Sequence, residues 1–161
     1  MIEVYSRSDL GEIIWRRIEE QGPKCDLNDI DVSRITDMSY LFENSEFDGD
    51  ISKWDMSNVE NMEYMFYNSA FNGDISNWDV SNVKNMDFMF GYSKFDGDIS
   101  GWDVSKVERM SFMFTHSPFN GDLSKWDVSS VRDMFYMFSD SKFDGDISEW
   151  DVSSVRDMGF M

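Results

Sequence analysis

Carboxylate side chains recur every 24 residues through most of this 161-residue chain and form two files, each with one aspartate per repeat. Regularly spaced carboxylates attract basic protein surfaces, and carboxylates in glycine-containing turns can also bind calcium. The first file consists of Asp31, Asp55, Asp79, Asp103, Asp127 and Asp151. The second file consists of Asp50, Asp74, Asp98, Asp122 and Asp146. Both files depend on the repeat that spaces them.

The repeat is clearest in the stretch from Phe47 to Ala70, which recurs without insertion or deletion. Later copies open at Phe71, Phe95, Phe119 and Phe143. A degenerate earlier copy precedes them, and the last copy stops at Met161, within the repeat. One copy alone cannot bury its apolar residues, whereas stacked copies can bury them in a continuous core. The period therefore predicts a solenoid of about six repeats over residues 25–161.

Two hydrophobic patterns alternate within each copy. Residues 53–57 alternate polar and apolar, which predicts a short strand with Trp54 inward and Asp55 outward. From Val59 onward the apolar residues are spaced as on one face of a helix, which predicts a short helix or 3₁₀ turn. The expected fold is thus an α/β solenoid with one short parallel strand and one short helix or 3₁₀ turn per repeat, and the first aspartate file on the exposed sheet face.

Residues 1–24 lie outside the period and have an amphipathic pattern. Leu10, Ile13, Ile14 and Ile18 form one apolar stripe, and Gly22 followed by proline ends the pattern. An amphipathic helix placed before the first coil is expected to cover the exposed end of its core. A membrane-surface helix or a partner-binding helix is the alternative interpretation.

The repeat resembles that of BspA-like bacterial leucine-rich-repeat surface proteins, in particular their short-repeat branch. The resemblance covers roughly residues 26–161 and rests on recurring motifs such as FNGDIS in residues 71–76 and WDVS in residues 78–81. It implies a right-handed solenoid with a parallel sheet on one side, display at a bacterial surface or secretion, and binding of other proteins. A cytoplasmic location remains open, because residues 1–24 lack the apolar stretch of a secretory signal.

Charge favours basic protein partners. The chain has 32 acidic and 14 basic residues, for a net charge of −18. This balance disfavours nucleic acids and anionic membranes as partners, and no segment is apolar enough for membrane insertion. The positions beside the first file vary between copies, which suits a surface that chooses its partner. These positions are occupied by Lys53, Asn77, Gly101, Lys125 and Glu149.

Nothing in the sequence indicates an enzyme. The only histidine, His116, stands at a position that is variable among the copies, and the only cysteine, Cys25, has no histidine near it in sequence. Phosphate-binding loops and zinc-ligand spacings are absent, so no cofactor is expected. Calcium at the second aspartate file is one hypothesis. The structural alternative is that both files serve turns, with Gly49 adopting a positive φ.

These features lead to three hypotheses of function. The first is a non-enzymatic protein-interaction or adhesion module that binds a partner with a basic surface through both the first file and the variable positions. The second is an intracellular acidic decoy that mimics nucleic acid, and the third is a structural spacer in a longer repeat protein. The unfinished last copy further suggests either a fragment of a longer array or end-to-end self-association through an uncapped coil.

Overall fold

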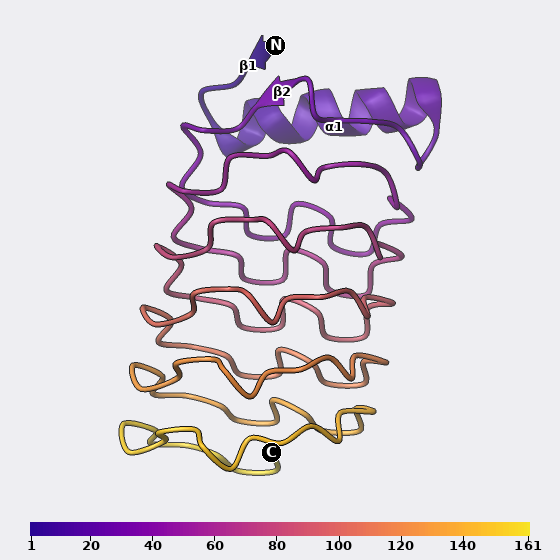
Figure 1. Cartoon of the computed structure of the whole chain (residues 1–161). Coiled ribbons are helices and arrows are strands. Elements are labelled where there is room, and N and C mark those ends of the chain that lie inside the picture. The colour runs from indigo at the N-terminus through magenta and orange to yellow at the C-terminus, as the bar shows by residue number, and fades with distance from the viewer.

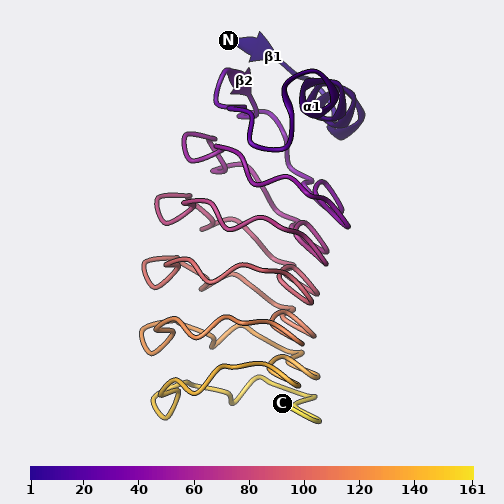
Figure 2. The same ribbon diagram turned by 90° about the vertical axis from the view of Figure 1, so that its right-hand side faces the viewer.

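The chain forms a stack of coils, described by a computed structural model that covers all 161 residues. Figures 1 and 2 show one coil above another, with the N-terminus at one end and the C-terminus at the other. Three regular elements are present: β1 (Ile2–Glu3), α1 (Arg7–Gln21) and β2 (Ile30–Asp31). All later coils consist of turns, irregular segments and isolated β-bridges between residues 24 apart.

The core runs through the stack as columns of like side chains. Phe42 and Phe66 stack with ring centroids 5.5 Å apart, and Trp54 and Trp78 stack at 6.4 Å. The cluster contains 43 buried hydrophobic residues. Each buried indole N–H also donates to a backbone carbonyl of the preceding coil, as Trp78 does to Ile51 at 3.1 Å. Adjacent coils are therefore joined by both apolar contact and buried hydrogen bonds.

The helix expected from Val59 onward is not formed, and the alternative, a 3₁₀ turn, is reduced to isolated bonds such as Met65 N–H to the Met62 carbonyl at 3.2 Å. Tyr64 and Asn68 have φ values of 55° and 50°, in the left-handed region that terminates a right-handed helix. The backbone N–H groups of Met62, Tyr64, Phe66 and Asn68 instead donate to carbonyls of the next coil at 2.8–3.0 Å. The amides that an isolated helix would use internally thus bind the neighbouring coil, and the apolar spacing arises from a series of turns.

The parallel contact between coils also lies away from the expected strand at residues 53–57. That segment has turn bonds such as Val59 N–H to the Met56 carbonyl at 2.9 Å. One parallel bridge joins Asp26 to Asp50, and the other five occur at Asp37↔Asn61, Asn61↔Asn85, Asn85↔Arg109, Arg109↔Asp133 and Asp133↔Asp157. Trp54 is nonetheless 4% exposed while Asp55 is exposed, as the alternation predicted. A turn can therefore reproduce the burial pattern of a strand without its hydrogen bonds.

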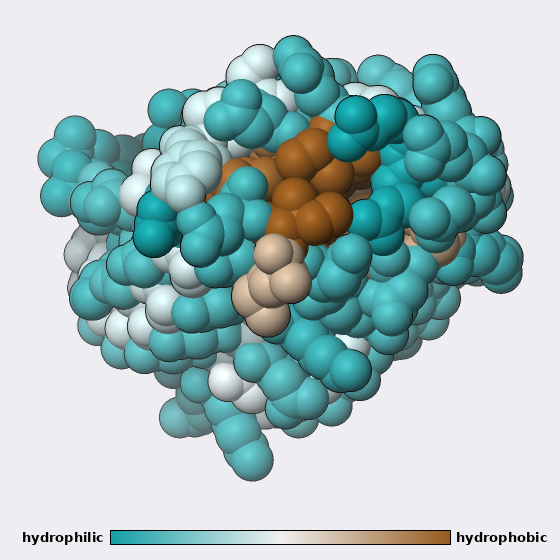
Figure 3. Space-filling view, turned by 90° about the horizontal axis from the view of Figure 1, so that it is seen from above, coloured by the Kyte–Doolittle hydropathy of each residue, from teal (hydrophilic) through white to brown (hydrophobic).

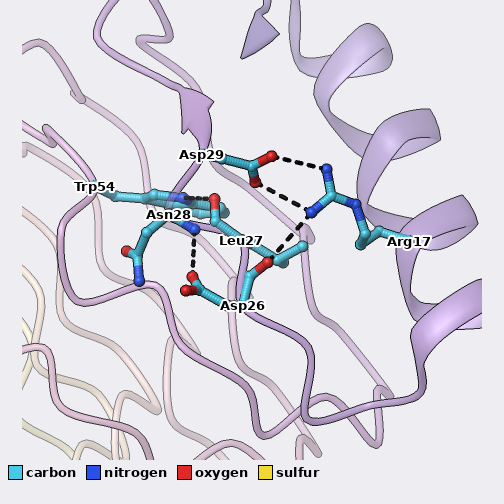
Figure 4. A network of polar contacts seen from close by, with 6 residues as sticks. All are labelled: Arg17, Asp26, Leu27, Asn28, Asp29 and Trp54. Carbon is cyan, nitrogen blue, oxygen red and sulfur yellow. Dashed lines mark hydrogen bonds and ion pairs between the residues drawn. The ribbon is translucent and has the colours of Figure 1, made fainter. Parts of the chain in front are cut away.

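Helix α1 covers the first coil, as Figure 1 shows. The Ser6 side chain accepts a hydrogen bond from the Asp9 N–H at 3.1 Å, which caps the N-terminus of the helix. Leu10 and Ile14 are fully buried against the core. The Arg17 guanidinium makes two 3.1 Å bonds to the Asp29 carboxylate of the first coil (Figure 4). The apolar stripe and this ion pair together attach α1 to the repeats.

The extreme N-terminus adds a contact that the sequence did not indicate. Strand β1 pairs in parallel with β2, with Ile2 opposite Ile30. Seen from above, this end of the stack shows a hydrophobic patch surrounded by polar side chains (Figure 3). A two-residue strand is too short to produce an alternating pattern, so this pairing could not be predicted.

Replacing Gly11 with alanine is expected to stabilise the protein. Gly11 lies inside α1, and an added methyl group would meet no atom within 4 Å. Alanine reduces the conformational freedom lost when the helix forms, which gives about 0.5–1 kcal/mol. Thermal denaturation should therefore show a melting temperature higher by about 1–4 °C. A lower melting temperature would mean that α1 is not helical at this position.

Candidate interaction site

Aspartates of the first file are held in tight local turns. The Asp55 Oδ1 atom accepts hydrogen bonds from the Ser57 backbone N–H at 3.0 Å and from its hydroxyl at 2.6 Å. The same backbone contact from the serine two residues later occurs at Asp31, Asp79, Asp103, Asp127 and Asp151. Asp55 and all its later equivalents are exposed, whereas Asp31 is half-buried. Each aspartate therefore has a structural contact and still presents a carboxylate to solvent.

Asp31 of the first file lies on a sheet, in β2, but the later members do not. Those members belong to the turn-forming segment of each coil, whereas the parallel bridges of the later coils lie at Asn61 and its equivalents. The expectation of a binding site on an exposed sheet face is therefore wrong about the backbone beneath the aspartates. The physical reason is that the inter-coil contacts of this segment come largely from buried side chains such as the Trp78 indole.

The second file lies in the same part of each coil and is built similarly. Asp74 Oδ1 accepts from the Ser76 N–H at 3.0 Å and from its hydroxyl at 2.7 Å. Two residues before each of the first three aspartates of the second file stand Asp48, Asn72 and Asp96. Each of these side chains accepts a hydrogen bond from a backbone N–H of the next coil. We call the surface formed by residues 48–55 and their equivalents in later coils the acidic face.

The variable positions lie within the acidic face. The residues of this set are all exposed: Lys53, Asn77, Gly101, Lys125 and Glu149. A hollow of about 550 Å³ at the first coils is lined by residues that include Lys24, Asp50 and Asp74. The structure therefore brings the predicted site residues together on one surface, without concentrating them in an apolar pocket.

Hydrogen bonds favour the ionised form of most of these carboxylates. Hydrogen bonds from Ser76 lower the pKa of Asp74, and they outweigh the opposing effect of burial and of Asp50 and Asp98 in the neighbouring coils. Hydrogen bonds from the following serine, first among the causes, lower the pKa of the others as well: Asp31, Asp50, Asp79, Asp98, Asp103, Asp122, Asp146 and Asp151. The local bonds thus offset the repulsion between neighbours in a file.

The protein is expected to lose stability in acid. Because the pKa values of these aspartates are lowered on folding, their contribution is present above the ordinary aspartate pKa of about 3.9 and is lost as the pH falls through the folded values. Asp87 acts in the opposite direction, because burial raises its pKa. Thermal denaturation from pH 7 to pH 2 should show a falling melting temperature below about pH 4. A constant or rising value there would contradict the proposed role of the serine hydrogen bonds.

A ladder of aromatic side chains on the bridged segment was not expected from the sequence. Consecutive rings stack with centroids 4.3–5.1 Å apart. The ladder consists of Tyr40, Tyr64, Phe88, Phe112, Tyr136 and Phe160, all with positive φ. The signal was an aromatic residue every 24 positions in all copies. Stacking of about 0.5–1.5 kcal/mol per pair helps to offset the cost of the left-handed conformation, so the ladder stabilises the stack.

Cys25 and His116, the residues considered for enzymatic chemistry, lie in different surroundings. Cys25 is buried, and burial raises the pKa of its thiol. His116 stacks on Tyr92 with centroids 4.4 Å apart, and its Nε2 atom lies 3.4 Å from an Asp140 carboxylate oxygen. No group of three or more His, Cys, Asp or Glu side chains converges closely enough to hold a metal ion. The calcium hypothesis therefore receives no candidate ligand cluster.

The stacked coils and the repeated surface define a repeat protein whose largest feature is an acidic face. Its family is shown by a family model that matches residues 16–118 and 92–161. The chain belongs to this family, whose description is "Mycoplasma protein of unknown function, DUF285". The search of curated proteins found no match, and the search of solved structures found none. Separately, the chain has no helix with the length and hydrophobicity needed to cross a membrane.

Proposed function

We propose that this chain is a non-enzymatic interaction module that binds a protein partner with a basic surface. The observation that carries the proposal is the acidic face. Each coil from Phe47 onward contributes at least two exposed carboxylates to it and at most one lysine. Such a surface attracts basic partners and accelerates their association.

Within each repeat, buried positions are largely constant and some exposed positions vary, which supports recognition by several coils together. Buried residues such as Trp102 and Phe114 fix the geometry of the stack. The exposed positions equivalent to Lys53 carry different side chains in different coils. In repeat proteins an extended surface of this kind binds partners through a few favourable positions. We infer that the variable positions select the partner, while the aspartates provide attraction.

The resemblance to BspA-like surface proteins adds two parts to the proposal. We propose that the stack of coils is a leucine-rich-repeat-like solenoid, and that it acts as an adhesion module at the bacterial surface or after secretion. An unbroken column of stacked rings supports the first part, and it consists of Phe42, Phe66, Phe90, Phe114 and Phe138. The second part rests on the resemblance alone.

An acidic decoy for a DNA-binding protein is the second candidate function. The net charge of −18 and the regular spacing of the carboxylates favour it. A decoy should compete with DNA for its partner and lose affinity steeply as salt increases. An adhesion module should retain its specificity near physiological salt, because it also uses contacts other than charge.

Affinity capture with matched variants tests the proposal. The first variant carries Asp79→Asn, Asp103→Asn and Asp127→Asn, which remove three charges but leave an oxygen that can accept the serine N–H. The control variant carries Glu12→Gln, Glu19→Gln and Glu20→Gln on the exposed side of α1. Both variants have the same net charge. The baits are exposed to extracellular-matrix and bacterial cytosolic extracts at physiological salt.

We expect the unaltered chain and the α1 control to retain the same extracellular or host-surface protein, and the aspartate variant to lose it. Enrichment of cytosolic DNA-binding proteins would instead support the decoy. Equal loss from both variants would show that only net charge matters and would contradict binding through the acidic face. Capture of nothing by any bait would overturn the interaction proposal and favour a structural spacer.

A further inference from the structure

A basic groove lies at the edge of this otherwise acidic chain. Its volume is about 480 Å³, and no hydrophobic residue lines it. The lining residues are Lys84, Lys106, Glu108, Ser129, Ser130, Arg132 and Ser154. Three of these side chains are cationic and one is anionic, which reverses the charge balance of the whole protein.

The groove occurs where a structural contact of the repeat is missing. In earlier coils an asparagine side chain donates to a carbonyl of the preceding coil, from Asn58 to Ser33 at 2.8 Å and from Asn82 to Ser57 at 2.7 Å. The next three copies have Lys106, Ser130 and Ser154 at this position and do not form the bond. The short serine side chains leave space that the bridging asparagine would occupy, so the hollow is a property of these coils and not of the repeat.

The cations of the groove differ in their partners. The Lys84 ammonium lies 2.8 Å from Glu60, and the Arg132 guanidinium lies 3.3 Å from Glu108. Lys106 has no carboxylate partner, because its ammonium donates only to the Asn82 amide oxygen at 2.7 Å. Glu60 and Glu108 thus balance two of the three lining cations, and Lys106 is the one whose charge has no carboxylate partner.

We propose that this groove binds a dianionic phosphate group, such as that of a phosphate monoester. Such a group carries about −1.5 to −2 charges at pH 7 and has acceptor oxygens enough to contact several of the lining side chains at once. Lys106 supplies an ammonium without an anionic partner, Arg132 supplies a planar guanidinium, and the hydroxyls of Ser130 and Ser154 can donate hydrogen bonds. This assignment does not depend on a partner at the acidic face.

Nuclear magnetic resonance titration with inorganic phosphate tests the site on the whole chain. Sodium phosphate at pH 7.5 replaces sodium chloride at constant ionic strength, and sodium acetate serves as a monoanionic control. We expect saturable shifts of the Ser129, Ser130 and Ser154 amides with a Kd on the order of 1–10 mM, and much smaller shifts with acetate. A parallel titration with sulfate separates recognition of phosphate from recognition of any tetrahedral oxyanion.

A groove-filling variant provides the matched comparison. Lys106→Asn with Ser130→Asn installs the residue that Asn58 and Asn82 already place at this position, so the fold is expected to accommodate it. Affinity for phosphate should fall at least tenfold in this variant, whereas Lys53→Asn on the acidic face should leave it unchanged. Absence of saturation, retained affinity in the double variant or equal weakening by Lys53→Asn would each overturn the proposal. Equal affinities for phosphate and sulfate would widen the ligand to tetrahedral dianions and support the groove.

Discussion

Replacing Trp102 with alanine is expected to lower the free energy of unfolding by about 3–5 kcal/mol. The Trp102 side chain is 4% exposed and lies at the middle of the stack. Its ring packs near Phe90, with centroids 6.3 Å apart, and its indole N–H donates to the Ile75 carbonyl at 3.1 Å. Alanine would therefore leave a cavity and remove one of the two hydrogen bonds that the Ile75 carbonyl accepts, the other being from the Trp78 N–H.

Urea denaturation measures this loss, with two variants for comparison. Trp102→Phe keeps most of the apolar volume and removes the indole bond, so its loss should be smaller. Trp15→Ala changes a side chain that is 41% exposed on α1, and we expect a change close to that of a surface substitution, about 0.5 kcal/mol. If Trp102→Ala were no more destabilising than Trp15→Ala, the tryptophan column could not be part of the core.

Replacing Gly49 with alanine is expected to destabilise the protein by about 3 kcal/mol. A methyl group at this position would lie 2.0 Å from the Cys25 carbonyl oxygen and 2.6 Å from the Phe47 ring. The expectation that Gly49 adopts a positive φ is wrong, because Gly22 is the only glycine with one. Glycine is needed at residue 49 because the backbone of the preceding coil and the Phe47 ring approach it closely.

Gly101→Ala is the matched control for Gly49→Ala. An added methyl group at Gly101 would meet no atom within 4 Å, and the φ of Gly101 is not positive. Alanine there should leave stability unchanged or raise it by about 0.4–1 kcal/mol. Thermal denaturation of the two variants should therefore give shifts that differ clearly. Equal shifts would show that close approach does not explain the glycine at residue 49.

The period and the direction of side chains could be predicted from the sequence, because both depend on burial. Any backbone that repeats every 24 residues must bury the same residues in each copy, so Trp54 lies inward and Asp55 outward. The helix before the repeats was predictable for similar reasons. Its apolar stripe and its terminal glycine both agree with α1.

The backbone conformation of the repeat could not be predicted in the same way. The apolar spacing from Val59 to Phe66 fits a helix, and only the left-handed conformation of Tyr64 excludes it. Tyrosine and phenylalanine rarely adopt that conformation, and no signal in the neighbouring sequence predicts it. Inter-coil bonds such as Met62 N–H to the Asn85 carbonyl stabilise it, and these bonds exist only after the coils stack.

The candidate surfaces differ in how far the sequence could reveal them. The aspartate files were visible as a period, although their turn bonds to residues such as Ser57 were only one of several interpretations. The basic groove was not visible, because its cations do not recur in every copy: Lys84 and Arg132 share a position that is glutamate in Glu60 and Glu108, and Lys106 stands at another position. Lys84 and Lys106 fall at separate places in the repeat, and the coil geometry brings them together.

The proposed function requires that the hydrogen bonds of the aspartates stabilise the fold, while their negative charge is not needed for folding and can serve a partner. The most direct test is the melting temperature of the Asp79→Asn, Asp103→Asn, Asp127→Asn variant beside the corresponding alanine variant. Asparagine can still accept the serine N–H, so we expect a fall of less than about 5 °C. Alanine removes three backbone hydrogen bonds and the Ser129 hydroxyl bond to Asp127, about 1 kcal/mol each, and should lower the melting temperature by about 8–16 °C. If the asparagine variant had the same melting temperature as the alanine variant, the charge itself would be required for folding. That result would contradict an acidic face whose charge is free to serve a partner.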